Sequence, residues 1–365
     1  MQLFFKGIVL LAAMIFVSCP GKPAAVSGLT IDRTELNLKL GQEQTVNASV
    51  LPGEADEKGI RWSSDAPQTV SVADGRIRGV LPGTATVTAE TVDGGFRRQC
   101  RVTVTDEVYI PDPLFRSYLF SLFGENSETG EKQIDLDADG IITLKEAEAV
   151  TVIHCYKLSN TPSEEKIADL TGLEYFVNLE ELACHYNKIE SLDLRSLSKL
   201  RRLYCFDNRL RELDLSGNPL LTEVSCGGNA LKQLSLESNR LLDTVDAGEC
   251  RLEKLDLTGL PELEYLVCSQ NRLRSLDVSR NPKLIHLSCY NNYMDRLDAR
   301  NCPNLDFLWC GQQINEAEGL YNLKLSLYLP RSLWDRWESD KEWGKPGSDG
   351  YPAETANTWV TLVKE

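Results

Sequence analysis

The chain has 365 residues, which is longer than one typical domain and predicts roughly two to four folded units. Its formal net charge of −15 argues against a nucleic-acid partner, because the chain offers no basic stripe that would neutralise phosphates. The eleven cysteines at first suggest a disulfide scaffold, but none of them form a CxxC pair, which makes a zinc knuckle a poor interpretation.

Residues 1–18 have the composition of a targeting segment, with Lys6 ahead of an apolar run from Gly7 to Val17. The run ends in Phe16-Val17-Ser18-Cys19, which resembles the lipobox of bacterial lipoproteins, although Phe16 stands where Leu is usual. The resemblance implies a lipidated Cys19 and a membrane anchor of acyl chains. The alternative is an ordinary signal peptide with an incidental cysteine. Residues 19–25 form a Pro-containing linker.

Residues 26–105 alternate apolar and polar side chains with a period of two, as in Leu36, Leu38 and Leu40, and turn signals such as Asp74-Gly75 separate the runs. About seven short strands of this kind predict an all-β sandwich, with Cys100 pointing inward. The stretches "VSGLTIDRTELNLKLGQEQTVNASVLP", "IRWSSDAPQTVSVADGRIRGVLPGTATVTA" and "CRVTV" resemble the bacterial Ig-like domain (group 2). The resemblance implies a spacer or adhesion module on a cell surface.

Residues 107–150 are expected to form a helical cap with a calcium loop. Residues 111–123 have the apolar spacing of a short helix, and a second helix is expected over 144–150. Between them, every position of the EF-hand loop pattern is filled. The expected ligands are the carboxylates of Asp135, Asp137, Asp139 and Glu146, the backbone carbonyl of Ile141, and a direct or water-mediated contact from Thr143. The chain has no second loop of this kind, so we expect one structural calcium ion; the alternative is a solvated acidic turn.

Residues 151–325 repeat with a period of 21 residues. If Leu179 is position one, the sixth column of the repeat reads Cys184, Cys205, Cys226, Ala247, Cys268, Cys289 and Cys310. The ninth column reads Asn187, Asn208, Asn229, Cys250, Asn271, Asn292 and Gln313. A fixed period of this length predicts a solenoid with a parallel β sheet, and the row resembles the leucine-rich repeat with Cys at its sixth position. Because Ala247 fits the same column, we interpret the cysteines as packed thiols, not as ligands or disulfide partners.

The aromatic-rich residues 326–365 are expected to cap the end of the solenoid. The fold class is therefore multidomain: an Ig-like sandwich, a short EF-hand-like helical unit, a leucine-rich repeat solenoid and a C-terminal cap. In this combination the chain resembles the internalin-like surface lipoproteins of Bacteroidetes. The resemblance implies an outer-membrane lipoprotein of the bacterial cell envelope, and it leaves the surface and the periplasmic side open.

The third, fifth and seventh columns flank the inward strand residues and are expected to form the concave face of the solenoid. Aromatic and histidine side chains gather towards both ends of this face, where they would anchor a protein loop or a sugar ring. The candidate ligand-binding residues are Tyr204, Phe206, Tyr265, His286, Tyr290 and Trp309. The alternative is that some rings pack on one another or under the C-terminal cap.

Catalysis is not expected. His185 and His286 lie five rows apart, about 24 Å at ~4.8 Å per strand, and no nucleophile motif or dinucleotide motif is present in the sequence. The first hypothesis is a non-enzymatic, membrane-anchored binding or adhesion protein that presents its concave face to a protein partner. The alternatives are a carbohydrate-binding accessory lipoprotein that holds a glycan and a purely structural envelope protein.

Overall fold

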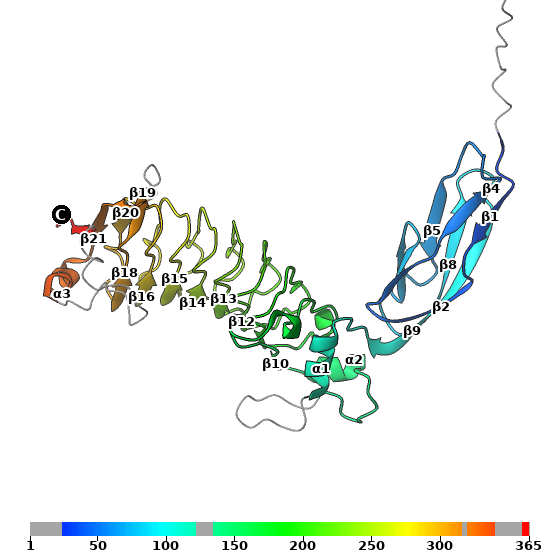
Figure 1. Ribbon diagram of the computed structural model, residues 1–365, viewed down its shortest axis with the longest axis horizontal. Helices are drawn as coiled ribbons and strands as arrows, with labels where there is room; N and C mark the ends of the chain where they lie inside the picture. The colour runs from blue at the N-terminus through cyan, green and yellow to red at the C-terminus, as the bar shows by residue number, and fades with distance from the viewer. Residues whose placement is uncertain (1–23, 122–133, 316–319, 340–359, 365) are drawn as a thin grey trace, which may run out of the picture. The chain divides into compact units, whose positions relative to one another are not determined.

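The computed structural model describes residues 24–121, 134–315, 320–339 and 360–364 (Figure 1). The chain divides into two compact units, with the division between Thr105 and Asp106, and each unit is described by itself. The predicted leader, Cys19 and the polar residues 124–132 lie outside the described residues. Within the described ranges, no helix has both the length and the apolar composition needed to cross a membrane.

The first unit is all-β, as the alternating pattern predicts. Its strands are β1 (Gly28–Ile31), β2 (Glu35–Leu40), β3 (Glu43–Thr45), β4 (Ala48–Leu51), β5 (Ile60–Ser64), β6 (Val70–Ala73), β7 (Arg76–Gly79), β8 (Gly83–Thr91) and β9 (Arg97–Val108). They form sheets in the orders β2-β9-β8-β5, β3-β7-β6 and β1-β4. Leu38, Val87 and Cys100 are almost completely buried, so the inward position predicted for Cys100 is confirmed.

A tight turn joins β6 to β7 at the Asp-Gly pair. Asp74 and Gly75 have φ angles of 50° and 79°, the left-handed values that a two-residue hairpin turn requires at both central positions. A Cβ added at Gly75 would lie 2.6 Å from the carbonyl oxygen of Val46. Both the backbone conformation and the close approach therefore require glycine at this position.

Two short helices open the second unit: α1 (Pro113–Ser121) and α2 (Leu144–Ala149). The Asp112 carboxylate caps α1 by accepting hydrogen bonds from the backbone N–H groups of Leu114 (2.8 Å) and Phe115 (3.1 Å). The same carboxylate accepts the N–H groups of Ala168 (2.9 Å) and Asp169 (3.1 Å). One side chain therefore connects the helical cap to the solenoid.

The repeats form one eight-stranded parallel sheet, visible in Figure 1 as the stack of short arrows from β10 to β18. The strands are β10 (Val152–His154), β11 (Glu181–Ala183), β12 (Arg202–Tyr204), β13 (Glu223–Ser225), β14 (Thr244–Asp246), β15 (Tyr265–Val267), β16 (His286–Ser288) and β18 (Phe307–Trp309). From β11 onwards the register follows the 21-residue period, so that Leu182 pairs with Leu203 and Leu203 with Val224. Between β10 and β11 lie two 3-10 turns, η1 (Ser163–Glu165) and η2 (Leu173–Tyr175). The predicted solenoid is confirmed by this register.

The sixth column forms the packed interior of the sheet. Cys184, Cys205 and Cys226 are fully buried, Ala247 occupies the same place in the next row, and every cysteine that the structure describes is a free thiol. Burial raises the pKa of the Cys268 thiol to about 12, which keeps it protonated. The interpretation of this column as packed thiols agrees with both observations.

The ninth column forms an asparagine ladder beside the thiols. The Asn229 side-chain amide donates hydrogen bonds to the carbonyl oxygens of Cys205 (3.0 Å) and Cys226 (2.9 Å), and its oxygen accepts the N–H of Leu210 (2.9 Å). The other asparagines of the column make equivalent bonds in their own rows. Cys250 replaces the amide with a single thiol contact, 3.5 Å from its Sγ to the Cys226 carbonyl oxygen. Each residue thus satisfies buried backbone groups of neighbouring rows.

The sequence pairs Asn218-Pro219 and Asn281-Pro282 predict turns, and the structure shows a second asparagine ladder at this nineteenth column. The amide of Asn239 donates to the carbonyl oxygens of Leu215 (3.0 Å) and Asn218 (2.9 Å), and Asn281 makes the same pair of bonds two rows later. Cys302 takes this place in the next row, with its Sγ 3.6 Å from the Val278 carbonyl oxygen. Cysteine therefore substitutes for asparagine in both ladders.

The alternation of Leu323, Leu325, Leu327 and Leu329 predicts one terminal strand, but the C-terminal segment forms several short elements. Its elements, together with the strand it joins, are β17 (Arg296–Asp298), β19 (Gln313–Asn315), β20 (Leu320–Leu323), β21 (Leu325–Tyr328), η3 (Arg331–Leu333), α3 (Trp334–Ser339) and β22 (Val360–Leu362). Lys324 separates two strands with different partners. β20 pairs antiparallel with β19, whereas β21 pairs in parallel with both β17 and β22. Leu327 stands opposite Leu297, so β21 continues the leucine row of β17, not the concave sheet.

Candidate functional site

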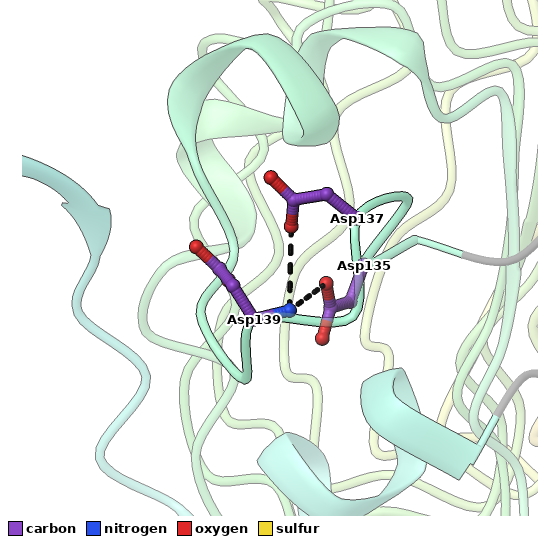
Figure 2. A group of neighbouring side chains, drawn as sticks. All are labelled: Asp135, Asp137 and Asp139. Atoms are coloured by element: carbon purple, nitrogen blue, oxygen red, sulfur yellow. Dashed lines mark hydrogen bonds between the residues drawn. The ribbon is translucent and has the colours of Figure 1, made fainter.

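The acidic loop brings together three of its predicted ligands. One carboxylate oxygen from each of Asp135, Asp137 and Asp139 lies within 4.8 Å of the others, and Figure 2 shows the three side chains around one turn. The backbone N–H of Asp139 donates to Oδ1 of Asp135 (3.2 Å) and to Oδ1 of Asp137 (3.3 Å). Asp135 is buried, whereas the other two are exposed.

Glu146 does not join this group, because its carboxylate is held by the loop backbone. Its oxygens accept the N–H of Leu136 (2.8 Å) and both the N–H (2.9 Å) and the hydroxyl (2.8 Å) of Thr143. Thr143 in turn caps α2 with its hydroxyl, which completes a capping box. Ile141, whose carbonyl is the predicted ligand, donates its N–H to Oδ1 of Asp139 at 2.9 Å.

The middle of the loop pairs with the chain that precedes α1. The N–H of Val108 donates to the Ile142 carbonyl oxygen at 2.8 Å, and Glu107 and Thr143 form an isolated antiparallel bridge. Ile142 is fully buried. The backbone partner that a second calcium loop supplies in a paired EF-hand is therefore supplied here by residues 107–108. The donor set of hard oxygens fits calcium, with Glu146 needing to exchange its backbone partners for the ion.

Rings on the concave face stack along the rows. In the seventh column, His185 lies between Tyr156 (ring centroids 4.4 Å apart) and Phe206 (4.2 Å). In the third column, His286 lies between Tyr265 (5.8 Å) and Phe307 (4.2 Å). The rings of Tyr290 and Trp309 are stacked, with their centroids 3.5 Å apart. The rings therefore pack on one another, as the alternative predicts. They are not fully buried by this packing, because each ring remains at least partly exposed.

Of the six candidate ligand residues, Tyr265 is the most accessible, at 45% exposed. Tyr204 is half-buried and donates its hydroxyl to a carboxylate oxygen of Glu223 at 2.8 Å. Burial, followed by this hydrogen bond, raises the pKa of Tyr204 well above its usual value. The hydroxyl of Tyr204 is thus bonded to a neighbouring side chain, whereas the ring of Tyr265 is exposed to solvent.

Charges at the N-terminal end of the face are paired. Nε2 of His154 lies 2.7 Å from Oε1 of Glu181, and Nε of Arg202 donates to its other oxygen at 2.6 Å. Burial would raise the pKa of Glu181, but these two partners hold it below its usual value. Burial, with the charge of His154 adding to it, lowers the pKa of His185 to about 4. The ring of His185 is therefore neutral near pH 7.

A shallow hollow of about 170 Å³ lies in the middle of the concave face. Gly227 and Gly248 form part of its floor, and the rings of Phe206 and Tyr290 border it. The charged residues that line it are Asp207, Asp246 and Glu249. Asp207 and Glu249 belong to the eighth column, which is not among the third, fifth and seventh columns predicted to form the concave face.

The eighth column shares a backbone conformation that its residue types do not indicate. Its residues all have a positive φ, between 50° and 63°: Tyr186, Asp207, Gly228, Glu249, Gln270, Asn291 and Gln312. Gly228 is the single glycine among these seven. Asp207 and Glu249 of this column are exposed and contribute to the edge of the concave face, whereas Asn291 is buried.

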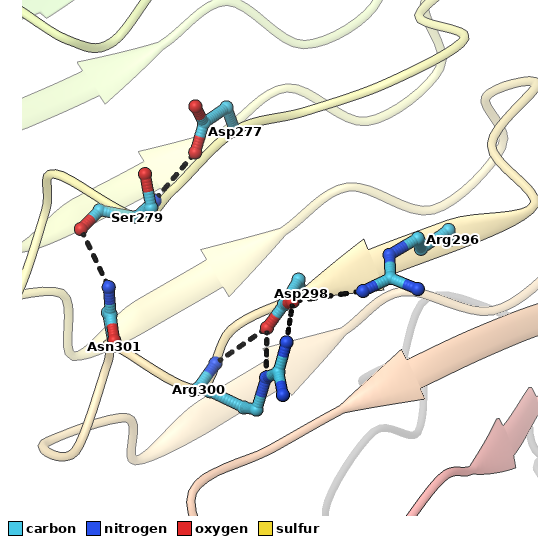
Figure 3. A network of polar contacts seen from close by, with 6 residues as sticks. All are labelled: Asp277, Ser279, Arg296, Asp298, Arg300 and Asn301. Carbon is cyan, nitrogen blue, oxygen red and sulfur yellow. Dashed lines mark hydrogen bonds and ion pairs between the residues drawn. The ribbon is translucent and has the colours of Figure 1, made fainter. Parts of the chain in front are cut away.

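A second hollow, of about 650 Å³, lies beside β17. Figure 3 shows Asp298 between two arginines of its lining: Asp298 accepts Nη2 of Arg296 (3.1 Å) and Nε of Arg300 (2.9 Å). The amide of Asn301 donates to the Ser279 carbonyl oxygen at 3.2 Å, which ties adjacent rows together. The guanidinium of Arg296 also lies 3.9 Å from the Tyr328 ring centre. This network stabilises the junction of β17 with β21.

The two domain types define a surface or binding protein, with an Ig-like sandwich followed by a leucine-rich repeat solenoid. Residues 25–102 match the family described as bacterial Ig-like domain (group 2). The resemblance recognised in the sequence of the first unit is thereby confirmed.

Similar curated proteins match only over the length of the Ig-like domain. An α-L-arabinofuranosidase of Bifidobacterium longum is 38% identical over 81 residues, 22% of this chain and 8% of that protein. An Ig-like virion protein of Serratia phage KSP90 is 32% identical over 83 residues, 22% of this chain and 32% of that protein. The chain therefore spans a small part of these relatives, and the glycosidase name describes a protein of which it matches 8%.

Solved structures similar to this chain include two from Listeria monocytogenes. An internalin from Listeria monocytogenes has a TM-score of 0.47 at 18% identity, covering 60% of this chain and 68% of that one. The functional domain of InlJ from Listeria monocytogenes, described as including a cysteine ladder, has a TM-score of 0.27 at 24% identity, covering 61% and 60%. The assignment of the solenoid rests on its own strand register.

Proposed function

We propose that this protein is a non-enzymatic binding or adhesion protein that presents the concave face of its solenoid to a protein partner. The observation that carries the proposal is the row of half-exposed rings on a rigid parallel sheet, with Tyr265 at 45% exposure. Aromatic side chains fixed by stacking lose little conformational entropy on binding and bury a large area, which makes them effective anchors.

The test is capture of partners by the purified chain from host-cell and bacterial extracts, in parallel with a glycan array. Alanine at Tyr265 and Tyr290 should abolish specific capture, while Glu253→Gln, at an exposed position outside the concave sheet, should leave it unchanged. If both tyrosine variants bind as the unaltered chain does, the concave face is not the binding surface.

A carbohydrate ligand is the second candidate, and one observation favours it. The exposed ring of Tyr265 lies over His286 at the edge of a stacked ladder, an arrangement on which a sugar ring can stack. Binding on the glycan array that is lost in Tyr265→Ala, without capture of a protein, would select this alternative. A purely structural role is the outcome if neither assay detects binding.

We further propose that Cys19 carries lipid and anchors the protein in the bacterial envelope as an outer-membrane lipoprotein. The proposal depends on the apolar run that ends at Cys19 in the sequence. Metabolic labelling with an alkyne fatty acid should mark the unaltered chain and leave Cys19→Ser unmarked. Labelling of both chains would remove the proposal.

We also propose that the acidic loop binds one structural calcium ion through Asp135, Asp137, Asp139, Ile141, Thr143 and Glu146. The convergence of three carboxylates in one turn and the oxygen-only donor set support it. Calcium would stabilise the cap by the amount that binding contributes, about 2.7 kcal/mol at one hundred times the dissociation constant.

Isothermal titration calorimetry of the full chain with calcium tests this proposal. Asp135→Asn should weaken binding, whereas Asp169→Asn, which alters an exposed carboxylate outside the loop, should not. Absence of heat with the unaltered chain, or equal heat with Asp135→Asn, would show that the loop is a solvated acidic turn.

A further inference from the structure

The hollow in the concave face interrupts the aromatic column. Phe206 and Tyr290 stand four rows apart in the seventh column, about 19 Å at ~4.8 Å per strand. Between them the column contains Gly227, Gly248 and Ser269. The two glycines carry no side chain where Phe206 and Tyr290 carry rings, so the face is lower between its ring-bearing ends.

The glycine at the first of these positions is also required by the packing of the rows. A Cβ at Gly227 would lie 2.9 Å from the Gly248 carbonyl oxygen, whereas a Cβ at Gly248 would meet Val267 at 3.3 Å. The floor is therefore fixed by the sheet backbone and does not depend on a mobile side chain. A rigid floor loses little entropy when a ligand binds.

The charge of the hollow is negative. Asp246 accepts the N–H of Gly248 (3.0 Å) and the hydroxyl of Ser225 (3.3 Å), which orient its carboxylate. Asp207 and Glu249 are exposed at the edge. Among the residues that the structure describes, no lysine or arginine forms an ion pair with any of these three carboxylates.

Two other carboxylates on the same face have side-chain partners outside the hollow. Glu181 is paired with Arg202 and His154, and Glu223 accepts the hydroxyl of Tyr204. Partial burial raises the pKa of Asp207, and the charge of Asp246 acts in the same direction against that of Lys166. The hollow thus groups three carboxylates of the concave face, and none of them is ion-paired among the described residues.

We propose that this part of the concave face is the docking surface for a basic segment of the protein partner, with a lysine or arginine side chain seated over Gly227 and Gly248 among the carboxylates of Asp207, Asp246 and Glu249. The charge of the hollow is complementary to a cation, and the aliphatic stem of such a side chain would lie against Phe206 or Tyr290. The proposal rests on the concave face being the binding surface, and it names the chemistry of the partner.

The test uses three short peptides of equal length, one of alternating lysine and glycine, one of alternating glutamate and glycine, and one of serine and glycine. Binding to the full chain is measured by fluorescence anisotropy at about 0.15 M salt, where the screening length is about 8 Å. The lysine peptide should bind at least about tenfold more tightly than the other two. Equal binding of the three peptides would overturn the proposal.

The decisive comparison is between two triple variants that each remove three negative charges. Asp207→Asn, Asp246→Asn and Glu249→Gln together should weaken the lysine peptide at least about tenfold. Glu212→Gln, Glu237→Gln and Glu253→Gln alter three exposed carboxylates outside the parallel sheet and should change it less than about twofold. Equal losses in both variants would show that the peptide responds only to net charge and would overturn the site.

Circular dichroism and thermal melting establish that both triple variants are folded, and Gly248→Ala supplies a second route that keeps every charge. Its methyl group reduces the depth of the hollow, so the lysine peptide should bind more weakly there as well.

If the hollow variants keep the captured partner while Tyr265→Ala loses it, the cationic inference fails and the proposed function remains. If the tyrosine variants also keep the partner, the proposed function fails.

Discussion

The sixth and seventh columns of the repeat are neighbours in sequence, and their side chains point to opposite sides of one sheet. The sixth is cysteine in all but one of the rows counted above, and its side chains are fully buried. The seventh changes from His185 to Phe206 to Gly227 within three rows. Burial between rows of fixed spacing restricts the inward column to one volume, whereas the outward column is free to vary with its ligand. Regularity therefore marks the core of this solenoid, and variation marks the surface that we assign to binding.

The largest effect expected from this difference is in thiol reactivity. In a chain carrying Cys19→Ser, the thiols of the sixth column should react with an alkylating reagent at least about 10³-fold more slowly than in denaturant, because they are exposed only by unfolding. Burial also raises their pKa, to about 12 for Cys310, so little thiolate is present at neutral pH. Mass spectrometry of a labelling time course gives the rates. Rapid labelling of Cys226 in the folded chain would show that the column is accessible.

The asparagine ladder should be the most sensitive part of the interior. Asn229→Ala removes an amide that bonds to the carbonyl oxygens of Cys205 and Cys226 and to the N–H of Leu210, leaving buried backbone groups unsatisfied. We expect a loss of about 3 kcal/mol in the free energy of unfolding by urea denaturation. Asn229→Cys should cost less, because Cys250 already occupies the equivalent position with one contact to a carbonyl oxygen. Equal costs would mean that the amide bonds contribute nothing beyond side-chain volume.

Much of this interior was predictable from the sequence, because each of its positions repeats. The recurrence of cysteine every 21 residues from Cys184, and of asparagine every 21 residues from Asn187, predicts the inward columns and the solenoid. The second ladder was missed because Leu197 and Leu260 interrupt the column of Asn218, Asn239 and Asn281. The pairing of β21 with β17 was missed because alternating leucines specify which face is buried but not which strand lies alongside.

The face was less predictable than the core. Column position correctly placed Tyr265 and Tyr290 on the outward side, but the stacking of His185 between Tyr156 and Phe206 depends on ring orientation. The hollow depends on left-handed turns at Asp207 and Glu249. Aspartate adopts this conformation occasionally and glutamate rarely, and no motif in the sequence marks these positions as turns.

A smaller effect is expected from the half-buried histidine on the face. Burial lowers the pKa of His185 from 6.5 to about 4, so between these values the unfolded chain binds a proton that the folded chain does not. The contribution of His185 to stability is complete above pH 6.5 and is lost as the pH falls towards 4, by about 1 kcal/mol after allowance for solvent screening of a half-buried ring.

Urea denaturation at about pH 7 and about pH 5 measures this loss against His185→Phe, which keeps a ring between Tyr156 and Phe206. The variant should lose less stability than the unaltered chain between the two pH values. The same loss in both proteins would show that His185 titrates normally in the folded chain.

The most direct measurement compares stability and partner capture in one variant from each column type, Cys226→Ala in the core and Tyr265→Ala on the face. Cys226→Ala should lower the free energy of unfolding by about 1 kcal/mol and keep full binding while the chain is folded. Tyr265→Ala, at a position 45% exposed, should leave the melting temperature nearly unchanged and lose the partner. Full capture by Tyr265→Ala, or loss of capture by folded Cys226→Ala, would contradict the separation of a packed interior from a binding face.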